Sequence, residues 1–520
     1  MPEAPPPRPA ADHADPAAGV PSRHPLAALH EVATMRARAA AVLRAVEDNV
    51  SMWFRLDRDA LPALADQLAE RYRALHGDGP PPLPSRWALL AAGAVDRVAE
   101  LDARLAGRSA DDAARARFDL ATVSVLVDAD PGERWRFRER DEIDRMALPL
   151  QQRGSDELLA LLDRVAAKPK PAAAAAPATA ANAPPAEAPA EPGGADRPAA
   201  VETGDAEADA AAAPAPAAAG APAAPAPAAA ASAMPLTGHE GLAVASLRAF
   251  LAGAFSSTAS DPLRADAAAL KLVDATALRA IFQSTPANPL TGVEARAARL
   301  ARLGDAVAGA GARHRLPPRP ALLFDRLTAG GTRREVAAGE LLAELLRCLS
   351  PAWRGGLVQG LPAGDTWPHR WAGHDTGGGR RDGTTGGWVP LHAPALTLAC
   401  ALVAPLQGAG VQVGGLDDLP APAGPAELAL LIDAGVLKPR NERDLERRLA
   451  PGDEWLVEGR VLALALIDEL AAAVAQRLGR PLGPLRLAAA TLPALAGELA
   501  QARRGGVPLP FTLDGEAAAA

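Results

Sequence analysis

Apolar residues recur at intervals of three and four along much of the chain. The clearest stripe consists of Leu61, Leu64, Leu68, Tyr72 and Leu75. Such spacing places side chains on one face of a helix, and Asp59 stands where it would cap this one. Comparable patterns predict further helices over residues 85–105, 114–129, 238–255, 274–281, 291–303, 335–349, 391–406, 428–434 and 457–478. Hairpin signals are scarce, so the pattern predicts a mainly α fold with at most a minor strand or two.

One predicted helix leaves an alternative open. The valine-rich end of residues 114–129 would also suit a buried strand, because short apolar runs do not distinguish the two structures. The preceding segment, ARARFDLA, has helical spacing. We therefore favour a helix there.

A polar loop leads into the helix predicted over 291–303. Pro286 and Pro289 restrict its backbone. Thr291 and Glu294 have the spacing of a capping box, and Gly304 would end the helix. The loop also supplies hydrogen-bonding side chains at Gln283, Ser284, Thr285 and Asn288. A helix N-terminus beside such a loop suits an anion, although spacing alone favours a simple connection between helices.

Composition separates the regions that can fold from those that cannot. Residues 168–234 are nearly all alanine and proline with scattered charges. Repeated proline prevents a continuous helix, and the few bulky apolar side chains cannot offset the entropy of ordering. We predict a disordered insertion there, a disordered N-terminal tail over 1–25 and a C-terminal tail over 514–520. The ordered regions are then 26–167 and 235–513.

Charge and cysteine usage exclude several classes of function. The net charge of −8 argues against a general nucleic-acid binder, which needs a basic face. Cys348 and Cys400 lie in apolar stretches without a partner at metal-binding or redox spacing, so we expect buried free thiols. No signal core or long uninterrupted apolar run is present. We therefore expect a cytoplasmic protein that uses no cofactor and contacts neither a membrane nor nucleic acid.

Two segments carry candidate chemistry. The glycine-rich residues 364–392 contain Asp365, Trp367, His369, His374, Asp375 and His392. Their spacing matches no compact metal signature, so a flexible loop is favoured over a metal site. The run GGGRR within this segment lacks the spacing of a phosphate-binding loop.

Carboxylates recur later in the chain, at Asp417, Asp418, Glu427 and Asp433. A pair of carboxylates beside a sugar could stabilise an oxocarbenium-like transition state and activate water. Solvated turns and a helix cap would place the same residues in the same pattern. Spacing alone favours the structural interpretation.

Segments along almost the whole ordered chain resemble one family, the uracil-catabolism proteins of the Urc/Urg type. The matching segments are SRWALLAAGAVDR, FDLATVSVLVDA with WRF, EGLAVASLRAFLAGAFS, FQSTPANPLTGVEARAARLARLG, LFDRL, GDTWPH, VPLH, LLIDAGVL and PGDEWLVEGRVLALALID. Members of that family usually pass directly from the WRF segment to EGLAVASL. The resemblance therefore implies that the insertion splits one helical domain.

This family is in turn similar to the queuosine salvage glycosylases, mainly α-helical enzymes related in fold to the helix-hairpin-helix DNA glycosylases. That similarity implies cleavage of an N-ribosidic bond, in a ribosylurea-type compound or its 5′-phosphate. It implies Glu427, or alternatively Asp417, as the catalytic carboxylate. The residues implied in substrate binding are Gln283, Asn288, Glu294, Arg296, Trp367 and His392.

The chain departs from the family at two of its characteristic positions. Gly424 stands where the family carries a glutamate and the salvage enzymes a catalytic aspartate, and Ala393 replaces a family lysine. Two hypotheses follow: an N-ribosyl hydrolase with reduced activity, in which Glu427 substitutes, or a non-catalytic ligand-binding or scaffolding relative. Either protein would take a small ribosyl or nucleotide-derived ligand. The sequence does not indicate an oligomeric state. A DNA-repair glycosylase is disfavoured by the acidic charge and by the lack of a hairpin followed by a catalytic Asp or Lys.

Overall fold

A computed structural model describes residues 25–139 apart from Pro80 and Pro82, residues 235–373, and residues 383–514 apart from Ala490. The described residues on the two sides of the gap at 140–234 belong to one compact unit. The predicted insertion and nearly all of both predicted tails lie outside the described residues.

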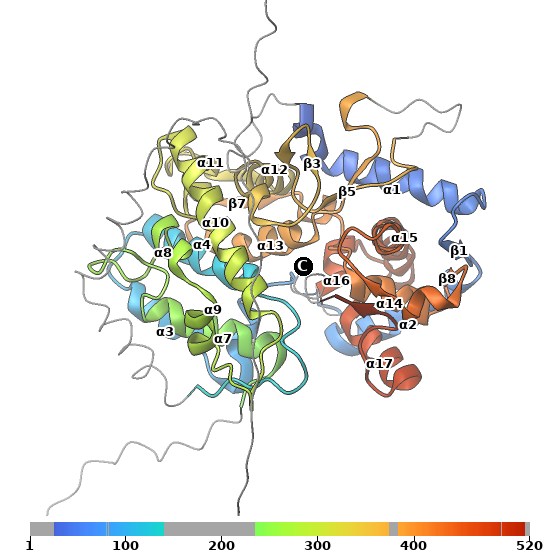
Figure 1. Ribbon diagram of the computed structural model, residues 1–520, viewed down its shortest axis with the longest axis horizontal. Coiled ribbons are helices and arrows are strands. Elements are labelled where there is room, and N and C mark those ends of the chain that lie inside the picture. The colour runs from blue at the N-terminus through green and yellow to red at the C-terminus, as the bar shows by residue number, and fades with distance from the viewer. Residues whose placement is uncertain are drawn as a thin grey trace, which may run out of the picture. The chain divides into compact units, whose positions relative to one another are not determined.

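The fold is mainly helical, as the sequence pattern predicts (Figure 1). The α-helices are α1 (Val32–Glu47), α2 (Ala60–His76), α3 (Arg97–Leu105), α4 (Ala110–Leu126), α7 (Gly238–Leu251), α8 (Ala267–Leu272), α9 (Ala275–Ile281), α10 (Val293–His314), α11 (Leu322–Leu327), α12 (Ala338–Leu349), α13 (Ala393–Gly408), α14 (Pro425–Asp433), α15 (Glu454–Leu478), α16 (Pro484–Ala489) and α17 (Thr491–Arg504). Short 3₁₀ helices are η2 (Pro25–His30), η3 (Ala88–Ala94), η4 (Ser350–Ala352), η5 (Gly383–Thr385), η6 (Leu416–Asp418) and η7 (Glu442–Glu446). Many α-helices begin at a side-chain cap that satisfies a free amide, as at Asp96, Ser109, Asp266, Asp274 and Asp453.

The strands are short and join segments that are mostly distant in sequence. They are β1 (Phe54–Leu56), β2 (Glu335–Ala337), β3 (Leu357–Val358), β4 (Leu361–Pro362), β5 (Thr366–Pro368), β6 (Trp388–Pro390), β7 (Gln412–Gly414), β8 (Leu437–Pro439), β9 (Arg448–Leu449) and β10 (Thr512–Leu513). Antiparallel pairs form between β1 and β8, β3 and β4, and β5 and β6. Parallel pairs form between β2 and β7 and between β9 and β10.

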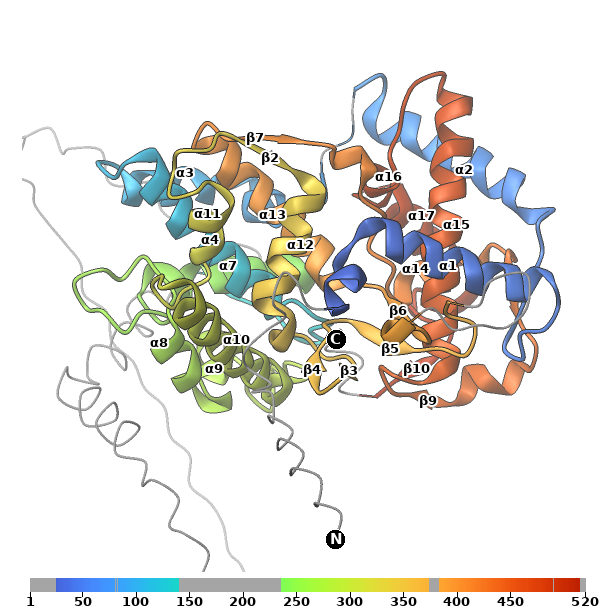
Figure 2. The same ribbon diagram turned by 90° about the horizontal axis from the view of Figure 1, so that it is seen from above.

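Early and late helices lie together, with α15 against α1, α2 and α14 (Figures 1 and 2). Elsewhere α13 packs against α4, and α10 packs against α8. The core is one large apolar cluster drawn from the segments on both sides of the insertion. In the part of the chain that the structure describes, no helix is long and apolar enough to cross a membrane.

The chain leaves the core before the insertion and re-enters it at one place. Phe137 and Leu236 exchange two backbone hydrogen bonds of 2.8 Å each. Trp135 is fully buried beside this bridge, and its indole donates to the Phe282 carbonyl at 2.7 Å. The segments before and after the insertion are therefore fastened to each other and to the same core.

Several helix boundaries differ from the predicted ones. Residues 85–105 form η3 and α3 rather than one helix, because Val95 is extended and Asp96 caps a new helix. Glu335 begins β2 rather than a helix, and α12 starts only at Ala338. Asp59 precedes α2, but its side chain makes no cap hydrogen bond.

The predicted capping box before α10 is wrong. The N-cap is Gly292, in the left-handed conformation with φ 69°, and the Thr291 amide donates to the Pro131 carbonyl at 3.1 Å. Glu294 pairs instead with Arg279 at the surface. The polar loop is thus held by tertiary contacts rather than by a local cap.

Gly304 was expected to end this helix, but α10 continues through it to His314. A Cβ at Gly304 would lie 2.8 Å from Lys271 Cγ and 3.0 Å from the Ala267 carbonyl oxygen. Glycine is therefore needed for the close approach of α10 to α8. Two other predictions are confirmed: the valine-rich end of α4 is helical, and both cysteines are buried free thiols.

The packing of α10 against α8 gives a test with a matched control. We expect Gly304→Ala to lower the free energy of unfolding by about 1–3 kcal/mol relative to Gly339→Ala, because it overpacks a helix contact. Gly339 lies in α12, where an added Cβ would meet nothing within 4 Å. Urea denaturation of both variants measures the difference. Equal stability of the two variants would show that α8 and α10 can move apart to accommodate the added methyl group without a loss of stability.

Candidate functional site

A cavity of about 270 Å³ opens where α4, α10, α13, α14 and α15 approach the β5 strand. Its charged and aromatic lining residues are Asp128, Arg299, Trp353, Arg354, Asp365, Trp367, Glu427 and Arg460. A second cavity, of about 650 Å³, adjoins it, and Trp353, Arg354, Trp367 and Pro451 line both. We call the first the inner cavity and the second the outer cavity.

A buried ion pair forms one wall of the inner cavity. Asp365 accepts hydrogen bonds from the Arg460 guanidinium at 3.1 and 2.6 Å. It also accepts from the Trp367 indole at 2.7 Å and from the Ala393 amide at 3.1 Å. Burial opposes ionisation here, but the Arg460 charge and these donors outweigh it and lower the pKa of Asp365. Asp365 is thus held as a carboxylate whose hydrogen-bonding positions are occupied.

Glu427 is another carboxyl group of the inner cavity, and its environment differs from that of Asp365. It lies in the first turn of α14, and its Oε2 accepts from the Gly424 amide at 2.8 Å. Among the described residues, no side chain donates a hydrogen bond to it. Burial raises the pKa of Glu427, and the backbone amides and the Arg460 charge offset only part of that effect. A cavity-lining carboxyl group with a raised pKa can act as an acid or a base near neutral pH.

The two positions where the sequence departs from the family it resembles line this same cavity. Gly424 and Ala393 are both wall residues. Gly424 is extended, with φ −106° and ψ −172°, a conformation that any residue adopts. A Cβ there would lie 3.2 Å from Glu427 Oε2. A side chain at position 424 would therefore begin beside Glu427 in the cavity wall.

Of the residues predicted to form the site, Glu427 and Trp367 line the inner cavity. Asp417 lies in η6, with an exposed side chain that pairs with Arg486 at 2.7 Å. His392 is buried at the start of α13, where Nε2 donates to the Leu29 carbonyl at 2.9 Å. Burial lowers the pKa of His392, so this ring is neutral near pH 7. Neither Asp417 nor His392 is a lining residue of either cavity.

The polar loop before α10 also lies outside both cavities. The Gln283 amide both donates to and accepts from the backbone of Arg138, at 2.7 and 3.0 Å. Asn288 makes the same pair of contacts with Arg136, both at 2.8 Å. These side chains fasten the segment that precedes the insertion.

Two further predicted residues have structural partners. Arg296 is fully buried and donates to the carbonyls of Val127, Ala129 and Asp130 just beyond the end of α4, at 2.9–3.2 Å. Burial lowers the pKa of Arg296 to about 10. Glu294 is exposed in its pair with Arg279. The structure therefore brings none of the four residues of the 283–296 region to the cavity wall.

The arginines of the inner-cavity wall were not among the residues predicted from the sequence to form the site. Arg299 and Arg460 lie within segments that carry the family resemblance, ARAARLARLG and PGDEWLVEGR. Arg354 lies outside them. Arginine is the abundant base of this chain, so its type alone carried no signal. For Arg299 and Arg460, the signal that could have identified them was their position within a segment that resembles the family.

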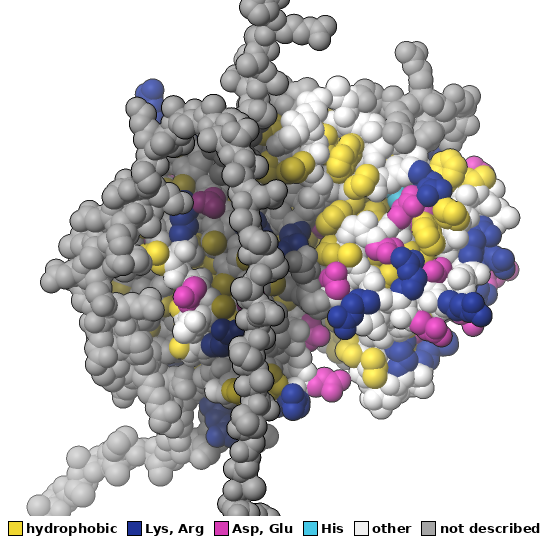
Figure 3. All heavy atoms as spheres, viewed as in Figure 1, with side chains coloured by type: hydrophobic (Ala, Val, Ile, Leu, Met, Phe, Trp, Pro, Cys, Tyr) yellow, Lys and Arg dark blue, Asp and Glu magenta, His cyan; other side chains and the backbone are white. Residues whose placement is uncertain are grey.

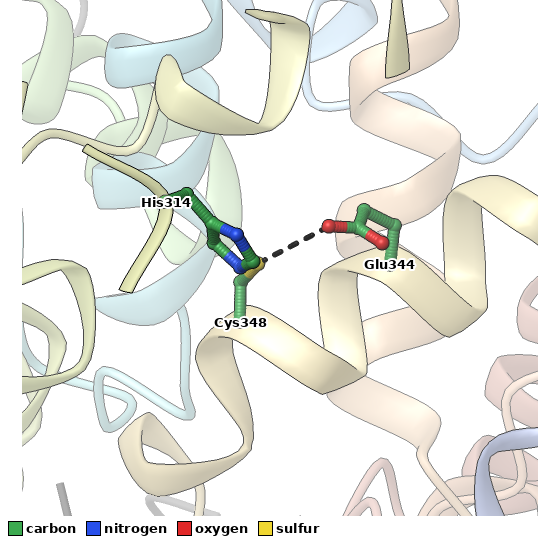
Figure 4. A group of neighbouring side chains, drawn as sticks. All are labelled: His314, Glu344 and Cys348. Atoms are coloured by element: carbon green, nitrogen blue, oxygen red, sulfur yellow. Dashed lines mark hydrogen bonds between the residues drawn. The ribbon is translucent and has the colours of Figure 1, made fainter. Parts of the chain in front are cut away.

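A separate group of potential metal ligands is explained by its ion pairs. His314, Glu344 and Cys348 bring one ligand atom each within 4.8 Å of one another (Figure 4). Glu344 already accepts from Arg326 and Arg347, and His314 Nδ1 lies 2.9 Å from Arg326 Nη1. Two guanidinium groups would repel a cation at this place. His374 and Asp375 of the predicted glycine-rich segment, and the GGGRR run, lie outside the described residues.

The surface charges form no basis for a nucleic-acid site on the face shown in Figure 3. There Lys and Arg side chains alternate with Asp and Glu over the described residues. A nucleic-acid interface needs a field of one sign to displace counterions from phosphates. The inner cavity is therefore the better candidate for function.

Comparison with known proteins places this geometry in a wider context. The model of a family described as "Protein of unknown function (DUF1688)" matches residues 28–148 and 226–516. Protein urg3 of Schizosaccharomyces pombe (strain 972) is 32% identical over 253 residues, which are 48% of this chain and 58% of urg3. The match thus spans less than two thirds of that relative. The two matched stretches flank an unmatched segment that falls in the gap between the described parts of the domain.

The ion pair in the cavity wall gives a second prediction. We expect Asp365→Asn to cost about 3–5 kcal/mol of unfolding free energy, because it leaves the Arg460 charge buried without its partner. Asp66→Asn, which removes the exposed partner of Arg477, should cost under about 1 kcal/mol. Denaturant unfolding of both variants at neutral pH measures these values.

The same variant should alter the response to acid. Since folding lowers the pKa of Asp365, its ionisation stabilises the fold above about pH 4 and that contribution is lost as the pH falls further. Stability of Asp365→Asn should thus fall less steeply below about pH 4 than that of the unmodified chain. If the stability of the two proteins falls in parallel as the pH is lowered, the lowered pKa of Asp365 in the folded chain is contradicted.

Proposed function

The chain belongs to the DUF1688 family of proteins of unknown function, and from that premise we propose that its inner cavity binds and hydrolyses an N-ribosyl intermediate of pyrimidine breakdown. The observation that carries the proposal is Glu427, a cavity-lining carboxyl group with a raised pKa. The resemblance to uracil-catabolism proteins and to the queuosine salvage glycosylases supplies the substrate class. Trp353 and Trp367 supply apolar walls on which a sugar ring can pack.

The reaction needs a charge beside the anomeric carbon and a base for water. As the bond from C1′ to nitrogen breaks, positive charge develops on the sugar, and ionised Glu427 stabilises it. A water oxygen then bonds to C1′ and gives its proton to Glu427. The departing nitrogen takes a proton from solvent water, and Glu427 later returns its own proton to solvent, so ribosylurea and water yield ribose and urea. Arg460 and Asp365 act as a neutral pair that fixes the wall.

A second candidate function is ligand binding without catalysis. Gly424 and Ala393 favour it, because the family's carboxylate and ammonium are both missing from the wall of one cavity. The Gly424 amide bond also gives Glu427 a local structural role. Turnover separates the two candidates, since both bind the ligand.

Urea release from ribosylurea and from its 5′-phosphate tests the catalytic proposal. We expect Glu427→Gln to lower the rate by about 100-fold or more while the ligand still binds, because the amide cannot accept a proton. Glu340→Gln, an exposed residue of α12 paired with Arg333, should leave the rate unchanged. Asp417→Asn tests the rival carboxylate and should also have no effect.

The pH profile gives an independent reading of the same residue. Burial raises the pKa of Glu427, so kcat/KM should fall as the pH drops through a value above 4.5, the ordinary value for a glutamate. The acid limb should be absent in Glu427→Gln. If the unmodified chain releases no urea, the non-catalytic candidate stands and the hydrolase proposal is wrong.

Restoring the missing groups offers a gain-of-function experiment. We expect Gly424→Glu with Ala393→Lys to release urea faster than the unmodified chain, because the new carboxyl group and ammonium would enter the cavity. Gly424 has extended backbone, and Glu427 Oε2 needs to move by only a few tenths of an ångström. A folded double variant with unchanged turnover would contradict the interpretation of the two departures.

A further inference from the structure

Arginine side chains gather where the inner and outer cavities meet. Arg299 lines the inner cavity, Arg302 lines the outer one, and Arg354 lines both. Arg299 and Arg302 lie three residues apart on α10 and so share one face of that helix. Arg354 follows η4, which packs against α10. Three guanidinium groups from two segments therefore converge on one place.

Arg299 is the buried member of this cluster. Its exposed fraction is 6%, and among the described residues its hydrogen bond goes to the Leu126 carbonyl, at 3.0 Å. No carboxylate forms an ion pair with it in the described part of the chain. Burial, with repulsion from Arg302, Arg296 and Arg354, lowers the pKa of Arg299 to about 10. The charge of Arg299 is thus buried and is destabilised by the arginines around it.

Three carboxylates of the same walls are already paired with cationic side chains, and burial raises the pKa of the fourth, Glu427, which favours its neutral form. Asp128 pairs with Arg86 and His239, each at 2.7 Å. Asp365 pairs with Arg460, as described above. In the outer cavity, Asp305 pairs with Lys271 at 2.5 Å. Repulsion of an incoming anion by these groups is therefore weak beside the attraction of the arginines.

We propose that this arginine cluster binds the phosphate group of a ribosyl 5′-phosphate whose sugar occupies the inner cavity. Planar guanidinium groups match phosphate oxygens, and a dianion offsets the unfavourable charge environment of buried Arg299. Glu427 lines only the inner cavity, Arg302 lines only the outer one, and the two tryptophans line both. A ligand that spans them carries its anomeric carbon and its phosphate at opposite ends. The proposal rests on the proposed function for the identity of the sugar and extends it to the phosphorylated substrate class.

Calorimetric titration of the full chain with ribose 5-phosphate, ribose and inorganic phosphate tests this site. We expect ribose 5-phosphate to bind at least about 10-fold more tightly than ribose, with inorganic phosphate competing. Arg354→Gln and Arg302→Gln should each weaken ribose 5-phosphate by about 10-fold or more and leave ribose unchanged. Arg333→Gln, an exposed arginine outside both cavities, is the matched control. Arg299 is not substituted, because it also bonds the end of α4.

The outcomes separate this proposal from the hydrolase. Equal affinity for ribose and ribose 5-phosphate, or unchanged binding in both arginine variants, would overturn the phosphate site. If ribosylurea is hydrolysed and phosphate does not inhibit, the hydrolase stands and the phosphate site fails. If ribose 5-phosphate binds through Arg354 and no urea is ever released, the phosphate site stands and the hydrolase fails.

Discussion

The buried ion pair between Asp365 and Arg460 is the interaction on which the candidate site depends. It joins the residue before β5 to α15, and through the Ala393 amide and the Ala423 carbonyl it also holds the start of α13 and the segment before α14. These are the same elements that form the cavity walls. A buried ion pair is stable only when its hydrogen-bonding positions are satisfied. The walls are therefore set by the protein's own contacts before any ligand arrives.

Against this satisfied pair, two groups of the cavities stand out as incompletely compensated. Burial shifts Glu427 toward its neutral form, and burial with like charges lowers the pKa of Arg299. The first would be favoured as a carboxylate by positive charge on a ligand, and the second by a ligand anion. A sugar that develops positive charge at C1′ and carries a phosphate at C5′ supplies both. The ligand that we propose, with charge of opposite sign at its two ends, would suit both groups.

Helical periodicity predicted most of the fold. It failed at residues whose role is set by a contact with a segment distant in sequence. Gly304 has the type of a helix stop, yet packing against α8 is what requires glycine there. Thr291 has the spacing of an N-cap, but its amide belongs to the Pro131 carbonyl. In the cavity, Glu427 and Trp367 were predicted through the family resemblance. Arg299 and Arg354 were missed, because nothing in helical spacing tells which arginine of α10 faces a segment some fifty residues away.

The polar loop from Phe282 to Asn288 illustrates how a local signal can have a non-local cause. Its donors and acceptors suggested a ligand-binding surface, but Gln283 and Asn288 bind the backbone on either side of Phe137. Phe137 in turn bridges Leu236, so the described segments on the two sides of residues 140–234 meet at one point. Closing a longer loop between fixed ends costs only about 0.6 kcal/mol for each doubling of its length. The loop therefore anchors the end of the first described segment, from which the chain can lengthen at little cost, through residues that line neither cavity.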